Sequence, residues 1–485
     1  MLFNSVEFSI YLPVVFLLYW FVFNRKVKLQ NLFIVVVSYL FYGWWDWHFL
    51  ILIVITSFCS WLSGVCIDKL RNGTSADTPE IRKKCKWVVG GNVALNLGIL
   101  IFFKYFNFFV ESFITSFSLL GINLESPLLY IILPVGISFY TFQALSYTID
   151  VYRKKLEPTY DMVAFFAFVS FFPQLVAGPI ERATNLLVQF YKPRNFTYPD
   201  AVNGMRQILW GFFKKIVIAD NCAIVVNDVF GNYTNYSAST LLLGAIFFSF
   251  QIYGDFSGYS DIAIGTARLF GITLKQNFNY PYFSRNIIDF WRRWHISLNT
   301  WFIDYVYIPL GGSWEGMYKH IRNIFIIFFL SGLWHGANWT FIIWGIYHAL
   351  LFIPLLLLSR KNNNKQTGFA KPVISMFITF LFVTVGWIIF RANTLPMAWN
   401  YISGLFSDSL FTIPKVSGAN NVTAIISLFF IFILLTVEWI NRNKPFGLDL
   451  CNVPNLFVRY SFYSLIIASI YFFGADASNF IYFQF

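Results

Sequence analysis

Apolar segments long enough to approach the width of a bilayer recur along almost the whole sequence. They occupy residues 5–23, 31–45, 48–66, 87–103, 128–149, 162–178, 203–222, 239–253, 323–340, 341–358, 373–390, 422–440 and 457–473. Because a helix needs about 20 mostly apolar residues to cross a bilayer, these segments predict about 11 to 13 crossings, with the remainder re-entrant or interfacial. The alternating pattern of barrel strands is absent. We therefore expect an all-α, polytopic helical membrane protein that forms a single domain over residues 1–485.

The composition supports a lipid environment. Charged residues make up only 12% of the chain, and 57% of its residues are hydrophobic, whereas soluble domains carry about 25% charged residues. The net charge of +12 does not indicate nucleic-acid binding, because the basic residues cluster at the ends of apolar segments, as in Arg25, Lys26, Lys28, Arg82, Lys83, Lys84, Arg153 and Lys154. The positive-inside rule places those loops in the cytoplasm and the N-terminus outside. Residues 5–23 lack the design of a cleaved signal peptide and are expected to be a retained first span.

Three segments interrupt the simple pattern of spans. Residues 171–182 contain two prolines and a glycine, which predict either a cavity-lining break or a kinked helix end. Residues 251–271 hold Asp255 and Asp261 among glycines and serines, and a carboxylate at membrane depth is a functional-site hypothesis by default. We favour the alternative that both carboxylates cap a helix N-terminus in a broken, cavity-shaping segment. Residues 284–312 combine many charges with a helical aromatic stripe, which predicts a helix at the interface.

His335 is the strongest candidate for a catalytic residue. It lies between two apolar spans, and Gly332 and Gly336 flank it closely enough for a backbone or a ligand to approach. A neutral imidazole, with an ordinary pKa of about 6.5, is a natural general base toward a hydroxyl group. The alternative is a core histidine that is hydrogen-bonded to a neighbouring carbonyl.

Two other histidines are secondary candidates. His348 follows Trp344 on the same helix face, where it could orient His335 or a substrate, or could simply be a packing residue. His295 stands beside Arg292 and Arg293 in 284–312. These three side chains can donate hydrogen bonds to an anionic donor substrate that arrives from the cytoplasm, or else to lipid phosphates.

The sequence indicates neither a metal site nor a bound cofactor. No two histidines share metal-ligand spacing, and none of the five cysteines joins them. A serine-nucleophile motif and a phosphate-binding glycine loop are also missing. The chemistry expected is direct transfer with acid–base assistance, or else the protein catalyses no reaction.

Ordered strings along nearly the whole chain resemble the membrane-bound O-acyltransferase (MBOAT) family, in its bacterial branch of alginate-type O-acetyltransferases. They are MLFNSVEFSIYLP at 1–13, LPVGISFYTFQALSYTIDVYR at 133–153, FFPQLVAGPIER at 171–182, YGDFSGYSDIAIG at 253–265, NFNYPYFSRNIIDFWRRWHISLNTWFIDYVYIPLGG at 277–312, LWHGANWTFIIWGIYH at 333–348 and FIYFQF at 480–485. Each string alone is weak evidence, but their order and combination are specific.

The resemblance implies a helical fold with a funnel or tunnel and a histidine at its centre. His335 matches the histidine of the family's Trp-His-Gly motif. His295 matches a second family position, which the eukaryotic branch usually fills with Asn. His348 matches a further histidine of alginate-type members, although Ala349 follows it here where Gly is common. We accordingly assign His335, His295 and His348 as catalytic.

The remaining candidates have supporting roles. Arg292, Arg293 and Trp294 are expected to bind the donor, and Asp255, Asp261, Trp334 and Asn338 are expected to shape the cavity or stabilise its walls.

The resemblance also implies the reaction. A cytoplasmic donor, acetyl-CoA, would give its acetyl group with His335 as general base, for O-acetylation of an exported polysaccharide such as alginate. The expected partners are membrane lipid, an extracytoplasmic protein that carries the acetyl group, and the polysaccharide itself. The expected location is the bacterial plasma (inner) membrane.

Two other functions are considered. One is D-alanyl transfer to teichoic acid from a carrier-protein thioester. The YIPLGG string and the FIYFQF terminus argue against it, because both resemble the acetyltransferase branch. The other is a polysaccharide or lipid transporter or flippase with a midplane site at Asp255 and Asp261, for which no inverted repeat is found.

Overall fold

The described part of the chain is helical and contains no strand. This computed structural model describes residues 1–72, 78–122, 124, 129, 131–176, 178–359, 370–418, 420–450, 453, 455–475 and 480–481. Most of the string FIYFQF and part of 128–149 lie outside these residues. The described residues form two compact units, residues 1–204 with 266–275 and residues 205–265 with 276–485. Each unit is described by itself.

Seven described helices are long and apolar enough to cross a membrane on their own: Trp47–Asn72, Pro79–Ser118, Ala238–Leu269, Trp339–Leu358, Pro372–Arg391, Asn420–Ile440 and Leu456–Phe473. Two shorter apolar helices cover Val6–Val22 and Val27–Gly43. Other apolar segments form short or interrupted helices. The segment 162–178, for example, is divided between α6 and α7. The prediction of an all-α polytopic membrane protein is confirmed.

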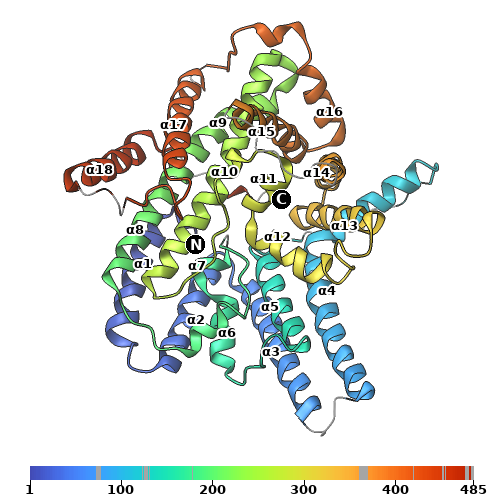
Figure 1. Cartoon of the computed structure of the whole chain (residues 1–485), viewed down its shortest axis with the longest axis vertical. Coiled ribbons are helices and arrows are strands. Elements are labelled where there is room, and N and C mark those ends of the chain that lie inside the picture. Colours follow the sequence, from blue (N-terminus) through green and yellow to red (C-terminus); the bar gives the residue numbers. More distant parts are fainter. Residues whose placement is uncertain are drawn as a thin grey trace. The chain divides into compact units, whose positions relative to one another are not determined.

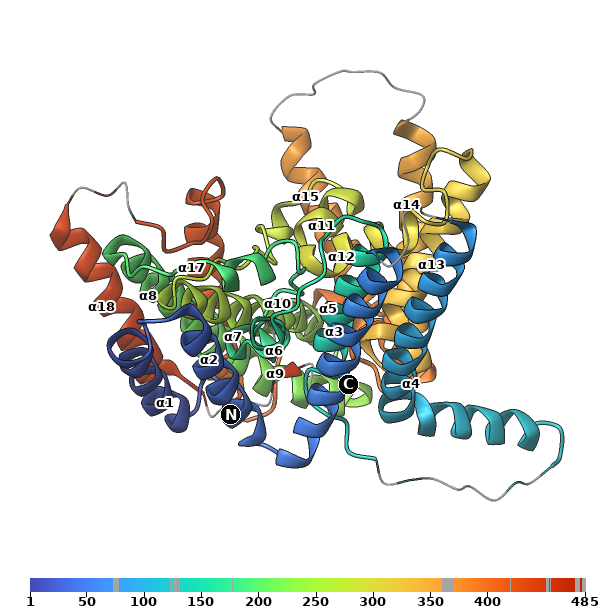
Figure 2. The same cartoon turned by 90° about the horizontal axis from the view of Figure 1, so that it is seen from below.

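The first unit contains the N-terminal helices, in which α3, α4 and α5 pack on one another and α2 packs on α6 (Figures 1 and 2). Their bounds are α1 Val6–Leu17, a π-helix Leu18–Val22, α2 Val27–Gly43, a 3-10 helix Trp47–Phe49, α3 Leu50–Asn72, α4 Pro79–Ser118, α5 Ile137–Tyr152, α6 Met162–Ser170, α7 Phe172–Leu175 and a 3-10 helix Leu187–Tyr191. On α3, a Cβ atom at Gly64 would lie 2.4 Å from the Tyr147 hydroxyl, so only glycine allows this approach to α5. After α7 ends at Leu175, the described residues 178–186 are not helical, so a helix ends within 171–182.

The second unit contains the candidate site. Its elements are most of α8 Tyr198–Phe212, a π-helix Phe213–Ala219, α9 Asp220–Gly231, a 3-10 helix Tyr233–Asn235, most of α10 Ala238–Leu269, a 3-10 helix Pro281–Phe283, α11 Ile287–Arg293, α12 Ile296–Phe302, a π-helix Ile303–Tyr307, α13 Met317–His335, α14 Trp339–Ser359, α15 Ala370–Arg391, α16 Leu395–Gly404, a 3-10 helix Asp408–Phe411, α17 Asn420–Ile440 and α18 Leu456–Phe473. Helices α13 and α14 form an antiparallel pair, and α15 packs on α14.

The prediction for residues 251–271 is wrong in one respect. The segment is not broken, because α10 runs without interruption from Ala238 to Leu269. Asp255 and Asp261 therefore lie in the interior of a helix and cap no N-terminus. The glycines permit close helix packing instead, since a Cβ atom at Gly258 would lie 2.8 Å from the carbonyl oxygen of Gly211 on α8.

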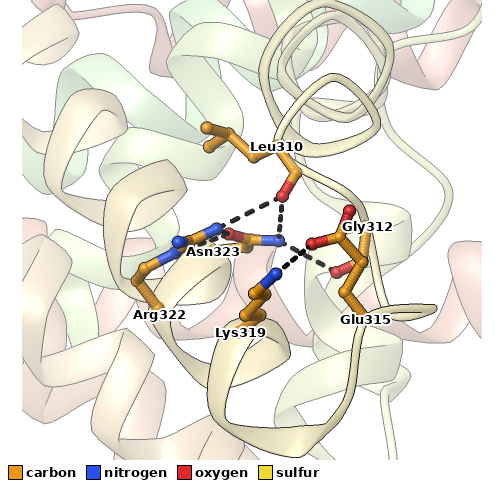
Figure 3. Close-up of polar contacts among 6 residues, drawn as sticks. All are labelled: Leu310, Gly312, Glu315, Lys319, Arg322 and Asn323. Atoms are coloured by element: carbon orange, nitrogen blue, oxygen red, sulfur yellow. Dashed lines mark hydrogen bonds and ion pairs between the residues drawn. The ribbon is translucent and has the colours of Figure 1, made fainter.

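The charged and aromatic segment 284–312 forms three short helical pieces, α11, α12 and the π-helix, and then a loop. The loop is fixed to the start of α13, as Figure 3 shows. The Asn323 side chain donates to the carbonyl oxygens of Leu310 (3.2 Å) and Gly312 (2.9 Å), and Arg322 donates to that of Leu310 (3.2 Å). These hydrogen bonds hold the loop that ends the segment 284–312 against α13.

Candidate active site

The α13–α14 hairpin positions His335, which is the last residue of α13 and is 3% exposed. Two glycines bring the helices together: a Cβ atom at Gly332 would lie 2.4 Å from the Phe341 carbonyl oxygen, and one at Gly345 would lie 2.2 Å from that of Phe328. Larger residues at these two positions would push the helices apart and displace His335.

Asn338 holds the turn that follows His335. Its Oδ1 accepts a hydrogen bond from the Thr340 backbone N–H (3.0 Å), as an N-cap residue does at the start of a helix. Its Nδ2 donates to the Asn393 carbonyl oxygen (2.9 Å). These contacts give Asn338 a structural role in the wall of the site.

His295 lies between α11 and α12 in a left-handed backbone conformation, with φ of +45°. A non-glycine residue in this region costs of order 1–3 kcal/mol and needs surrounding structure to maintain it. That structure is present: Ile296 N–H donates to the Asn277 carbonyl oxygen (2.9 Å), and the Asn299 side chain donates to the carbonyl oxygens of Trp291 (2.5 Å) and Trp294 (2.6 Å). No pattern in the sequence predicts this strained turn.

The turn points the His295 ring toward His335. The two ring centroids are 6.4 Å apart and the rings are perpendicular. His295 is 1% exposed, and neither of its ring nitrogens has a hydrogen-bond partner among the described residues. Burial lowers the pKa of His295 to about 3, so its imidazole is neutral at physiological pH. A neutral ring with an unused nitrogen on each side can donate one hydrogen bond and accept another.

Aromatic side chains enclose His335 and separate it from water. Its ring centroid lies 5.0 Å from that of Trp334, 5.1 Å from that of Trp344 and 5.5 Å from that of Phe390. Trp344 also lies 5.2 Å from His348, which is fully buried. The structure therefore gathers the three candidate histidines around one aromatic cluster. In such a low-dielectric enclosure, hydrogen bonds to developing charge are stronger than in water.

Of the residues expected to bind the donor, the two arginines lie outside this cluster, whereas Trp294 adjoins it through Trp387, which stacks on Trp344. Arg292 is exposed, and the Arg293 Nε pairs with Asp289 Oδ1 at 2.8 Å. Trp294 is 1% exposed and packs in the core against Trp387, with ring centroids 4.9 Å apart. Hence His295 turns inward, while the two arginines before it remain nearer the surface.

Asp255 and Asp261 form buried ion pairs with lysines of the π-helix after α8. Lys214 Nζ lies 2.6 Å from Asp261 Oδ2, and Lys215 Nζ lies 2.8 Å from Asp255 Oδ1 and 2.7 Å from Asp220 Oδ1. The two lysines are not among the residues predicted from the sequence, although their adjacent positions inside the apolar segment 203–222 are a signal that could have identified them.

A small cavity lies beside the Lys214–Asp261 ion pair. It has a volume of about 20 Å³, enough for a single water molecule. Its lining includes Lys214, Asp261, Glu438 and Asn277. Asn277 also accepts a hydrogen bond from the Ser297 hydroxyl (2.9 Å), just after His295. The described residues contain no group of three or more His, Cys, Asp or Glu side chains that could hold a metal ion.

The fold and the site together define a multi-pass helical membrane protein with a buried histidine at a helix end, enclosed by aromatic rings. Comparison with known proteins identifies it further. Residues 152–399 match the model of the membrane-bound O-acyltransferase family. The chain belongs to this family and is an O-acyltransferase.

The chain is also similar to curated relatives that differ in their acceptors. It is 40% identical to a probable alginate O-acetylase of Pseudomonas aeruginosa over 86% of this chain and 77% of the relative. It is 34% identical to a peptidoglycan O-acetyltransferase of Helicobacter pylori over 84% and 80%. A teichoic acid D-alanyltransferase of Bacillus subtilis is 32% identical over 53% and 69%.

Proposed function

We propose that this protein transfers an acetyl group from acetyl-CoA at the cytoplasmic side for O-acetylation of an exported polysaccharide, with His335 as general base. The observation that carries the proposal is the position of His335, buried in an aromatic enclosure at the C-terminal end of α13 with a second, neutral histidine beside it.

His335 would take the proton from the acceptor hydroxyl while its oxygen attacks the thioester carbonyl carbon. A C–O bond forms, the C–S bond breaks, and the proton passes from His335 to the departing thiolate. The imidazole is thus protonated only between these two steps. Its place at the C-terminal end of α13 favours that charged form, because a helix dipole stabilises a cation there by about 0.3–1 kcal/mol.

The oxygen of the tetrahedral intermediate needs a hydrogen-bond donor. His295 is suited to this role because it is neutral, buried and 6.4 Å from His335 between ring centroids. Removing one such donor from an enzyme typically costs 10²–10³-fold in rate, roughly 2.7–4 kcal/mol.

The choice of acetyl and of polysaccharide rests on similarity. The relatives that cover more than four fifths of this chain are named as O-acetylating enzymes of alginate and of peptidoglycan. The D-alanyltransferase matches only 53% of the chain, which makes D-alanyl transfer the second candidate. A flippase is less well supported, because the carboxylates proposed for its site are paired with lysines.

The proposal includes the surroundings of the enzyme. It places the protein in the bacterial inner membrane, with acetyl-CoA entering from the cytoplasm. An extracytoplasmic partner protein would receive the acetyl group and pass it to the polysaccharide. Arg292 and Arg293 are proposed to contact the phosphates of the donor.

The test is His335→Ala, with His320→Ala as its matched control. His320 is on the same helix, near its start and only partly buried. We expect His335→Ala to abolish polysaccharide O-acetylation in cells while the protein still accumulates in the membrane and elutes as one species in detergent. His320→Ala should retain activity. Full O-acetylation with His335→Ala would refute the role of His335.

The donor is tested with purified protein. Labelled acetyl-CoA and an alanyl-carrier protein are offered separately, and label transferred to an acceptor is measured. Transfer from acetyl-CoA alone supports acetylation, whereas transfer from the alanyl carrier alone would replace it with the second candidate.

A further inference from the structure

We propose that Trp291 is a positioning residue that fixes His348 as the tautomer with its proton on Nε2, so that His348 serves as a hydrogen-bond donor to a substrate oxygen and not as a second base. This inference rests on the proposed function, since it assigns a role within the acyl-transfer site.

The contact between Trp291 and His348 determines the tautomer. The Trp291 indole nitrogen donates to His348 Nδ1 at 3.3 Å, and the two rings are perpendicular with centroids 5.0 Å apart. An indole N–H can only donate, so Nδ1 must carry a lone pair. The imidazolium form is excluded while this bond exists, because both of its nitrogens carry hydrogen. The one proton of the ring therefore lies on Nε2.

Packing around His348 preserves this arrangement. This side chain of α14 is fully buried against α11, α13 and α15, and its ring stacks on Phe328 of α13 with centroids 6.2 Å apart. Trp291 is held in turn by Trp344, at 5.6 Å between centroids. Rings locked on several sides cannot rotate to exchange the two nitrogens of His348.

The Nε2–H group has no hydrogen-bond partner among the described residues. The neighbouring position is Gly386 on α15, where a Cβ atom would lie only 2.8 Å from Nε2. Any other residue would press against the nitrogen. Buried polar groups are nearly always hydrogen-bonded in folded proteins. The His348 ring contacts Trp344, and the Trp344 ring also contacts His335. The unpaired Nε2–H group therefore lies close to the reacting groups, and we infer that its missing acceptor is an oxygen atom of a bound ligand.

The division of labour follows from these geometries. His335, at a helix C-terminus, is placed to accept a proton, and His348, with its acceptor nitrogen occupied by Trp291, is placed to donate. Sequence alone could not assign the donor role to His348, because the partner of its Nδ1 is 57 residues away on another helix.

The first test reads the tautomer directly. Protein labelled with ¹⁵N-histidine is measured by NMR in membranes at pH 7.5, and the His348 signals are assigned by their loss in His348→Gln. We expect a proton on Nε2 in the native protein and a mixture of tautomers in Trp291→Phe. A proton on Nδ1 in the native protein, or an unchanged tautomer in Trp291→Phe, would overturn the inference. Trp314→Phe, at a residue 77% exposed, is the control and should change nothing.

The second test uses activity. A glutamine amide nitrogen can replace Nε2–H, and an asparagine amide lies closer to the Nδ1 position. His348→Gln should therefore keep acetylation within about 10-fold of native, while His348→Ala should lose about 10²–10³-fold, the usual effect of removing one donor. Trp291→Phe should lower kcat in the native background and have little further effect in His348→Gln. Equal loss in His348→Gln and His348→Ala would refute the donor role.

Failure of the two proposals can be distinguished. If His335→Ala remains active, the proposed function fails while the tautomer measurement still stands. If the tautomer is not the one expected but His335→Ala is inactive, only the present inference falls.

Discussion

Replacing Lys215 with methionine should destabilise the protein far more than its modest change in size suggests. The Lys215 ammonium lies 2.7 Å from Asp220 and 2.8 Å from Asp255, and all three side chains are at most 4% exposed. Removing one member of a buried ion pair typically costs 3–5 kcal/mol, since it leaves an uncompensated charge, and here two carboxylates lose the same cation. We expect a loss at the upper end of that range.

A graded series makes this prediction sharp. Asp255→Asn leaves Lys215 paired with Asp220 and removes one charge-assisted hydrogen bond, which should cost about 1.5–3 kcal/mol. The double variant Lys215→Met, Asp255→Asn should recover part of the loss, because one of the two orphaned charges is gone. Lys319→Met breaks an exposed pair with Glu315, at 47% and 50% exposure, and should cost no more than about 1 kcal/mol.

The assay is thermal unfolding in detergent, followed by the loss of the monodisperse chromatographic peak. Extrapolated to this chain length, a loss of 4 kcal/mol lowers the midpoint by roughly 4–8 °C. Equal midpoints for Lys215→Met and Lys319→Met would refute the reasoning, and so would a double variant less stable than the sum of its singles.

Two further predictions concern the site. Gly345→Ala places a Cβ atom 2.2 Å from the Phe328 carbonyl oxygen and should cost about 1–3 kcal/mol or more by overpacking. Gly91→Ala, with no atom within 4 Å, should instead gain up to about 1 kcal/mol of helix propensity, and a reversed order of the two midpoints contradicts this account. Stability should also fall with acidity: the pKa of His295 is about 3 when folded and about 6.5 when unfolded, so the unfolded chain alone binds this proton between those values. From pH 6.5 to pH 4.5 the free energy of unfolding should fall by about 2 kcal/mol. Stability curves of the native protein and His295→Gln that run parallel over this interval would disprove it.

Sequence predicted the helical membrane class because long apolar segments have few other solutions. The place of His335 at a helix end could also be predicted, since it stands between glycines where one apolar segment ends. Its catalytic role depends on the resemblance of the Trp-His-Gly motif and stays a prediction. Two adjacent lysines in an apolar segment are a sequence signal for buried charge, but which carboxylate each one pairs with could not be derived. Both lysines lie about one helix before Asp255 and Asp261 in the chain, and pairing between helices leaves no periodic signal. Helix continuity through Gly254 and Gly258 was underestimated for a related reason: glycines that suggest a break in isolation serve here to admit a neighbouring helix.

The prediction for His295 illustrates another limit. Its place beside Arg292 and Arg293 suggested a shared anion-binding role, but the left-handed turn sends the ring inward and leaves the arginines behind. Backbone conformation at one residue, which no hydrophobic pattern records, decided on which side of the segment the imidazole lies.

That turn also restricts which residues position 295 can accept during evolution or in a mutant library. Among residues other than glycine, Asn, Asp and His enter the left-handed region most readily, whereas β-branched residues are strongly disfavoured. A change from His295 to Asn keeps the backbone conformation and a hydrogen-bond donor, so this single substitution should leave a folded protein. A change to Val or Ile would require a different backbone conformation between α11 and α12. In a library varied at position 295, the residues recovered should therefore be mainly those that tolerate the left-handed conformation, whatever their effect on catalysis.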